Sequence, residues 1–173
     1  MLIPSIHWKW TIEPQTRILQ VELDAGLIFK TAFSERQLRE VPQNLLFDIY
    51  HCQAFMESVE ALEMSGVPFD DQTKLQIGLN ATAAISFHKT VVNKSWLCRK
   101  NQSCISGPEK QLAWLNNKEQ NLLLLCLAEQ GDTRLAMNLS DDFTSGDGKT
   151  HGQFSVLSVL SDRLLSFDLL DED

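Results

Sequence analysis

The segment Asp71-Gln-Thr-Lys-Leu-Gln-Ile-Gly-Leu-Asn-Ala-Thr-Ala-Ala-Ile-Ser-Phe-His-Lys89 decides the fold of the first half of the chain. Asp70 or Asp71 can cap a helix that begins here and runs to about Lys89. Apolar residues surround this helix and leave almost no polar stripe: Leu75, Ile77, Leu79, Ala81, Ala83, Ala84, Ile85 and Phe87. Such a helix must be covered on most sides, so we expect it to lie between a sheet and a second helix.

The second helix is predicted immediately before it. Asp48 can cap its start, and Gly66, followed by Pro68, ends it. Its apolar residues recur at steps of three and four and predict one buried face: Ile49, Cys52, Met56, Val59 and Leu62.

The first 33 residues predict an antiparallel meander of three strands. Trp8, Trp10 and Ile12 alternate with polar residues, and the stretches 17–23 and 27–33 repeat the alternation after turns at 13–16 and 24–26. One face of these stretches is expected to be buried: Leu19, Val21, Leu23, Leu27, Phe29 and Phe33. Ser34 and Gln37 have the spacing of a capping box and open a short helix that stops near Pro42.

From Thr90 onward the pattern changes to short strands separated by turns. Strands are expected at 94–98, 111–115, 121–128 and 133–139, with a helical segment at 155–165. The fold class is therefore α+β, with an N-terminal meander packed with helices (1–89) and a small, twisted, barrel-like antiparallel β domain (90–165). Residues 166–173 are expected to form a loose acidic tail.

Composition excludes several classes of protein. The 173 residues carry a net charge of −8, from 15 basic and 23 acidic residues, so we expect neither a nucleic-acid partner nor binding to an anionic membrane. No apolar stretch approaches the roughly 18 residues of a membrane-spanning helix, and the first residues do not have the pattern of a signal peptide. We expect a soluble cytoplasmic protein.

One part of this acidic chain is locally basic. Five cations stand against the single Glu109 between residues 94 and 118: Lys94, Arg99, Lys100, Lys110 and Lys118. This local balance suits an acidic protein partner.

The sequence predicts no catalytic machinery. Residues 146–150 end like a phosphate-binding loop, but Phe143 stands where that motif requires glycine. The four histidines are too widely spread to predict a metal site, and the acidic residues between 141 and 147 lack the calcium-loop pattern. We expect no catalytic residues, no metal and no cofactor.

Six short motifs resemble, in order and spacing, the ZapC family of Z-ring-associated proteins of bacterial cell division. The similarity covers roughly residues 7–165. The motifs are Trp8-Lys-Trp10, Leu23-Asp-Ala-Gly26 followed by Phe29, Leu79-Asn-Ala81, Lys94-Ser-Trp96, Glu119-Gln-Asn-Leu-Leu123 and Ser161-Asp-Arg-Leu164.

The resemblance implies a non-enzymatic cytoplasmic protein that binds the tubulin-like GTPase FtsZ, bundles its protofilaments and stabilises the Z-ring at midcell. It also implies two partner-binding sites. Carried over by position, the apolar one in the first domain falls on the strand 17–23, with Val21 and Leu23 the matching positions. To these we add Trp8, Trp10 and Phe29, from the large aromatic residues of this domain that can line a cleft for a partner. A basic one in the second domain can be placed only on the five cations between 94 and 118. Because the loop 141–150 and the acidic tail depart from the family pattern, no function of the family's tail is carried over.

A hypothesis of another class stays open, namely a small-molecule-binding or catalytic α+β protein with an apolar cleft. It predicts convergent polar groups in that cleft, and the sequence shows none. Bundling, in contrast, requires either two sites per chain or self-association. We expect a monomer with two sites.

Overall fold

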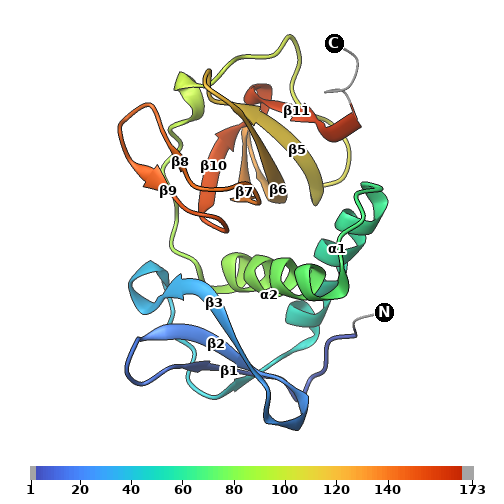
Figure 1. The fold of residues 1–173 in the computed structure, drawn as a ribbon, viewed down its shortest axis with the longest axis vertical. Helices are drawn as coiled ribbons and strands as arrows, with labels where there is room; N and C mark the ends of the chain where they lie inside the picture. The colour runs from blue at the N-terminus through green and yellow to red at the C-terminus, as the bar shows by residue number, and fades with distance from the viewer. Residues whose placement is uncertain (1–2, 169–173) are drawn as a thin grey trace. The chain divides into compact units, whose positions relative to one another are not determined.

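The computed structural model describes residues 3–168, which form an α+β fold, as expected (Figure 1). The helices are α1 (Ile49–Met64) and α2 (Asp71–Phe87). The strands are β1 (Lys9–Ile12), β2 (Ile18–Glu22), β3 (Ile28–Ser34), β4 (Leu45–Leu46), β5 (Gln111–Asn116), β6 (Asn121–Gln130), β7 (Thr133–Asn138), β8 (Phe143–Thr144), β9 (Thr150–His151), β10 (Val156–Leu160) and β11 (Leu164–Ser166). Short 3-10 turns lie at Asp24–Gly26, Glu35–Gln37, Ser95–Leu97 and Ser161–Arg163.

The chain divides into two compact units. The first comprises the residues up to Glu60 together with Pro68–Thr90, and the second comprises Ala61–Val67 together with the residues from Val91 onward. Each unit contains one main antiparallel sheet.

The sheet of the first unit has the strand order β3-β2-β1-β4. Its first three strands are the expected meander, and Trp10 pairs with Val21, which pairs with Phe29. The expectation failed for Leu27, which lies at the β2–β3 turn and is 66% exposed. Strand β4 was not expected because two residues, Leu45 and Leu46, are too short to show an alternating pattern.

Helix α2 is buried from Ile77 to Ala84 and at Phe87, as its sequence predicts, whereas residues 71–76 and Ile85 are exposed or half-buried. The side chain of Asn80, only 1% exposed, links it to the edge strand β3. Its Oδ1 atom accepts a hydrogen bond from the Ala32 amide at 2.8 Å, while its Nδ2 atom donates to the Gln76 carbonyl at 2.9 Å. A buried polar side chain is thereby satisfied, and an edge amide of the sheet gains an acceptor.

The helix caps are those expected from the sequence. Asp48 Oδ1 accepts from the His51 amide at 2.9 Å at the start of α1, and Asp70 Oδ1 accepts from the Thr73 amide at 2.7 Å at the start of α2. Each bond gives a partner to an amide that has none within its helix.

The buried side of α1 differs from the expected one. Ile49 and Met56 are exposed, whereas Phe55 is fully buried. The buried residues are His51, Ala54, Phe55, Ser58, Val59, Ala61 and Leu62. Phe55 explains the difference. Its ring meets Trp8 edge-on at 5.8 Å and packs on α2 at Gly78, so the side of α1 that carries Phe55 faces the core.

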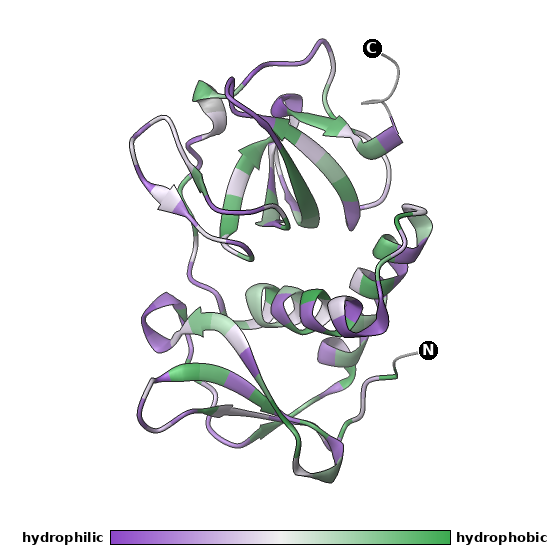
Figure 2. Cartoon of the chain, in the orientation of Figure 1, coloured by the Kyte–Doolittle hydropathy of each residue, from purple (hydrophilic) through white to green (hydrophobic). Residues whose placement is uncertain are grey.

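The sheet of the second unit has the strand order β10-β7-β6-β5-β11. Figure 2 shows most of β6 in the hydrophobic colour, and Leu122, Leu124 and Cys126 of this strand belong to a buried apolar cluster. Within residues 3–168 no pairing joins β10 to β11, so the sheet is open rather than a closed barrel.

Two sequence expectations for this unit were wrong. Residues 155–165 are not helical but form β10, a 3-10 turn and β11, because the β-branched Val156 and Val159 suit a strand that pairs with β7. Residues 94–98 are not a strand but contain a 3-10 turn. The Asn93 side chain accepts from the Ser95 amide at 2.9 Å and thereby stabilises this turn.

The acidic tail is held by the sheet at its beginning. Ser166 pairs with Ala113 in β5, and the Phe167 ring stacks on Trp114 with centroids 5.6 Å apart. The expectation of a loose segment is therefore wrong for these two residues. Residues 169–173 lie outside the described residues.

Helix packing predicts that Gly78→Ala lowers the stability of the first unit. A Cβ atom at Gly78 would lie 2.7 Å from Cε2 of the fully buried Phe55 and 3.2 Å from Cγ2 of Val59. We expect a loss of about 1–3 kcal/mol in the free energy of unfolding, measured by urea denaturation. The cost should shrink in a Phe55→Leu background. Helix propensity alone predicts the opposite, a gain of up to about 1 kcal/mol, and such a gain would contradict the close packing.

Candidate partner-binding surfaces

The five residues of the expected apolar site occupy different depths in the first unit. Trp10 and Val21 have no exposed surface, and Trp8 is 6% exposed. Leu23 and Phe29 are half-buried. In this conformation a partner can touch Leu23 and Phe29, while Trp10 and Val21 support the surface from the core.

Aromatic rings fill the core behind this surface. Trp10 stacks on Phe47 with centroids 4.8 Å apart and meets Phe87 edge-on at 5.1 Å. The Trp8 Nε1 atom donates to Asp24 Oδ2 at 2.9 Å and so anchors the β2–β3 turn that carries Leu23. The surface therefore lies on a packed aromatic core.

His51 is the titratable group in this aromatic core. Its Nδ1 atom accepts from Trp10 Nε1 at 3.4 Å and from the Asp48 amide at 3.2 Å. Burial lowers the pKa of His51, and the nearby Asp48 carboxylate opposes this effect only in part. Both accepted hydrogen bonds require Nδ1 without a proton, so the neutral ring is the form that fits the fold.

The second unit contains a pocket of about 620 Å3 with basic character. The loop 99–106 forms one wall, and the other walls come from Trp114 and Asn116 of β5, Asn121 of β6, Arg163 and the strand β11. Among the described lining residues, three are cations and none is a carboxylic acid.

Three backbone hydrogen bonds hold the loop 99–106 in place. The Arg99 amide donates to the Asn116 carbonyl at 2.9 Å, the Asn101 amide to the Asp162 carbonyl at 2.8 Å, and the Ile105 amide to the Ser161 carbonyl at 3.0 Å. The last two bonds join the loop to the 3-10 turn that precedes β11. Segments about sixty residues apart in sequence thus form one site.

Only some of the five cations of the basic segment line the pocket. Arg99 and Lys100 line it, whereas Lys94, Lys110 and Lys118 do not. Lys94 pairs instead with Asp147.

Arg163 completes the cationic lining, and sequence reasoning did not select it. Its Nη1 atom lies 2.8 Å from Asp162 Oδ1, and Lys100 Nζ lies 3.6 Å from Asp162 Oδ2. Asp162 therefore holds Arg163 in position, while Arg99 and Lys100 remain largely exposed. The motif Ser161-Asp-Arg-Leu164 drew attention to this turn, but its position facing the 99–106 loop follows only from the fold.

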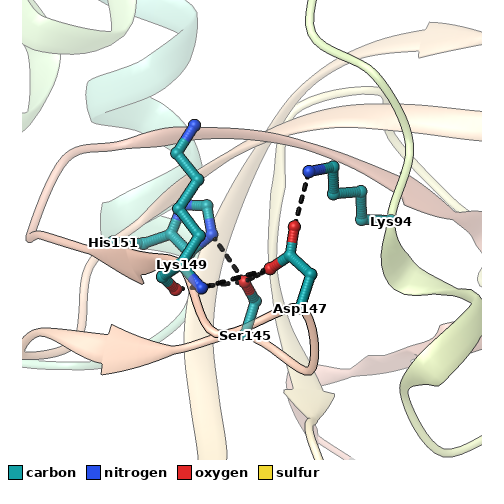
Figure 3. A network of polar contacts seen from close by, with 5 residues as sticks. All are labelled: Lys94, Ser145, Asp147, Lys149 and His151. Atoms are coloured by element: carbon teal, nitrogen blue, oxygen red, sulfur yellow. Dashed lines mark hydrogen bonds and ion pairs between the residues drawn. The ribbon is translucent and has the colours of Figure 1, made fainter.

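Lys94 and the β8–β9 hairpin form a separate polar network (Figure 3). Asp147 accepts from Lys94 Nζ at 2.5 Å, from the Ser145 hydroxyl and from the Lys149 amide at 3.3 Å. These bonds, that from Lys94 above all, hold the pKa of the Asp147 carboxyl well below its usual range. Lys94 is thereby engaged within its own unit.

A serine, a histidine and an aspartate meet in this network, but not as a catalytic triad. His151 Nε2 lies 3.1 Å from Ser145 Oγ, and Asp147 bonds the same hydroxyl rather than the other ring nitrogen. In a triad the histidine lies between serine and aspartate, so that it can take the serine proton. Here the serine proton faces a carboxylate, and the arrangement stabilises the hairpin.

Within residues 3–168, no three His, Cys, Asp or Glu side chains are grouped so that they could hold a metal ion. The helices of the same residues include none that is long and apolar enough to span a membrane.

Comparison with known proteins gives a consistent result. A family model for the N-terminal part of the cell-division protein ZapC matches residues 1–89. The cell division protein ZapC of Pseudoalteromonas atlantica is 31% identical over 170 residues, which cover 95% of this chain and 93% of the relative. The ZapC proteins of Shewanella oneidensis (27% identity; 95% and 93% covered) and Aliivibrio salmonicida (26%; 99% and 96%) are similar over comparable lengths.

The environment of His51 predicts that the first unit loses stability in mild acid. Because the folded-state pKa is lowered, the unfolded chain binds the proton first as pH falls. The stabilisation that neutral His51 provides is complete above the pKa of about 6.5 that histidine has in the unfolded chain, and it is lost as pH falls below this value. Burial also lowers the pKa of His88, which belongs to the same unit, so His88 acts in the same direction.

The measurement is the urea midpoint at pH 7.5 and at pH 5.5, in the wild type and in His51→Asn. Asn offers an acceptor near the Nδ1 position and does not titrate, so the variant should lose less stability between the two pH values. An equal loss of stability in both proteins would show that His51 does not cause the loss.

Proposed function

The chain belongs to the ZapC family of cell-division proteins, and on this basis we propose that it binds FtsZ, bundles its protofilaments and stabilises the Z-ring. The protein then acts in the cytoplasm at midcell, where the ring assembles, and its role is that of a filament-binding adaptor rather than an enzyme.

The observation that carries the proposal is the cationic pocket in an otherwise acidic chain. The chain has a net charge of −8, yet Arg99, Lys100 and Arg163 converge on a single pocket. FtsZ is itself acidic in the picture that the family implies, so the two proteins repel at long range unless opposite charges meet locally. The pocket supplies such a place, and an acidic FtsZ segment is its proposed ligand.

The strength of this contact depends on several cations acting together. A single exposed ion pair contributes under about 1 kcal/mol and is screened by salt. Arg163 differs from the other two because its side chain is 13% exposed and already oriented by Asp162. Less side-chain entropy is lost when a pre-oriented guanidinium binds a carboxylate, which favours Arg163 as the anchor of the site.

Bundling needs a second point of attachment, and the apolar surface of the first unit is the proposed one. Leu23 and Phe29 supply its accessible part, and Trp8, Trp10 and Val21 support it from below. A monomer with one apolar and one cationic site can connect two protofilaments, whereas a monomer with one site only decorates them.

Charge reversal in the pocket tests the cationic site. We expect Arg99→Glu/Lys100→Glu to reduce co-sedimentation with polymerised FtsZ at least tenfold at 0.05 M salt and to flatten its salt dependence. The matched control is Lys110→Glu/Lys118→Glu, which changes the net charge equally outside the pocket lining. Equal losses in both variants would indicate a general charge effect and would contradict a site in the pocket.

The apolar site is tested by two substitutions in β2 and at its end. Val21→Asp should unfold the first unit, because an unpaired carboxylate at a fully buried position costs several kcal/mol. Leu23→Asp should stay folded by circular dichroism and still co-sediment with FtsZ, but electron microscopy should show single filaments instead of bundles. Normal bundles with folded Leu23→Asp would exclude Leu23 from the second site.

A further inference from the structure

Strand β11 lines the cationic pocket along its edge. Its residues Leu164, Leu165 and Ser166 are consecutive, and all three line the pocket. Successive side chains of a strand point to opposite faces of its sheet, so a pocket that all three residues reach lies beside the strand. β11 ends the strand order of its sheet next to β5, and within residues 3–168 no strand pairs with its other side (Figure 1). The unpaired edge of β11 therefore faces the pocket.

Two hydrogen bonds show how the backbone groups of β5 are directed. The Asn117 amide donates to the Gln120 carbonyl at 3.2 Å across the turn between β5 and β6, and the Asn116 carbonyl accepts from the Arg99 amide at 2.9 Å. The backbone groups of successive strand residues point alternately to the two neighbouring strands. Those of Trp114 and Asn116 therefore point away from β6, toward the side of β5 on which β11 lies.

The same alternation gives the direction of the groups in β11. Leu165 pairs with Trp114, so its amide and carbonyl point to β5, whereas the groups of Leu164 and Ser166 point to the pocket. The Leu164 amide donates to the Ser161 carbonyl in the preceding 3-10 turn. On the pocket side, the Leu164 carbonyl can act as an acceptor and the Ser166 amide as a donor.

Both ends of β11 are held in place. Before the strand, the Asp162 carbonyl accepts from the Asn101 amide at 2.8 Å. After the strand, the Phe167 carbonyl accepts from Trp114 Nε1 at 3.2 Å, and the Phe167 ring stacks on the same indole. An edge that is already ordered loses little conformational entropy when a ligand binds to it.

The surrounding charges select the ligand. Among the described lining residues, the charged ones are Arg99, Lys100 and Arg163, and Asp162 neutralises at most one of these cations. An edge of only three residues pairs weakly with an arbitrary strand. The cations beside it add attraction for carboxylates, so an extended acidic segment fits both the edge and its charge.

We propose that the acidic partner segment binds in this pocket as an added strand of the second unit's sheet. Its backbone bonds the Leu164 carbonyl and the Ser166 amide, and its carboxylates lie near the three cations. In this mode of recognition, main-chain hydrogen bonds give affinity and side chains give specificity. The added strand is argued from the pocket and β11, whereas the assignment of the segment to FtsZ rests on the proposed function.

Two peptides of equal charge test the added strand. One is a short synthetic peptide in which aspartate and valine alternate, and the other is the same peptide with every backbone nitrogen methylated. Methylation keeps the carboxylates but removes the amide that donates to the Leu164 carbonyl. At low salt we expect the methylated peptide to bind at least about fivefold more weakly. Equal affinities, or no binding of the unmodified peptide, would overturn the proposal.

Amide hydrogen exchange locates the bond in the protein. A saturating amount of the unmodified peptide should slow exchange of the Ser166 amide at least about fivefold and leave the Leu165 amide, which faces β5, unchanged. Unaltered exchange at Ser166 would contradict the added strand. Protection of Ser166 in the free protein that disappears on dilution would also contradict it, because a second copy of this chain would then occupy the edge.

Ser166→Pro tests whether FtsZ uses the same edge. Proline is tolerated in an edge strand when its nitrogen faces away from the sheet, and Ser166→Ala, which keeps the amide, is the matched control. We expect folded Ser166→Pro to co-sediment with polymerised FtsZ at least about fivefold less than Ser166→Ala, with the same salt dependence. Equal co-sedimentation overturns strand addition by FtsZ and leaves the proposed function intact. If the peptide results hold but the wild type does not bind FtsZ, the proposed function fails and the added strand stands.

Discussion

The burial of helix α2 constrains the packing of the first unit, and the hydrogen bond from the Ala32 amide to the Asn80 carboxamide joins this helix to the edge of the sheet. From Ile77 to Ala84 helix α2 is buried, so its side chains there must be small, apolar or fully satisfied. Gly78 allows α1 to approach, which places Phe55 and then Trp8 in the core. Trp8 in turn donates to Asp24 in the turn next to Leu23, and this bond connects the half-buried surface at Leu23 and Phe29 to the core.

Local signals in the sequence were sufficient for most of the fold. The caps at Asp48 and Asp70 and the alternation in β1–β3 depend on neighbouring residues, and the structure agrees with both. The errors arose where tertiary contacts override local preference. The buried side of α1 is set by Phe55 packing on Gly78, and residues 156–160 are a strand because β7 offers them a partner.

The pocket could be predicted only in part, for the same reason. A count of charges finds Arg99 and Lys100, but it cannot separate them from Lys94, whose ammonium is engaged by Asp147 in the β8–β9 hairpin. Arg163 lies outside the basic segment and reaches the pocket because the turn at 161–163 bonds to the backbone of the 99–106 loop. Such bonds between distant segments have no signature in the sequence.

Amide hydrogen exchange in the presence of FtsZ polymers tests most directly whether this pocket receives the proposed partner. We expect slower exchange for residues 99–106 and 163–166 when polymers are added, with the core of β6 unchanged. Exchange in 99–106 that stays the same while other parts of the chain become protected would contradict it.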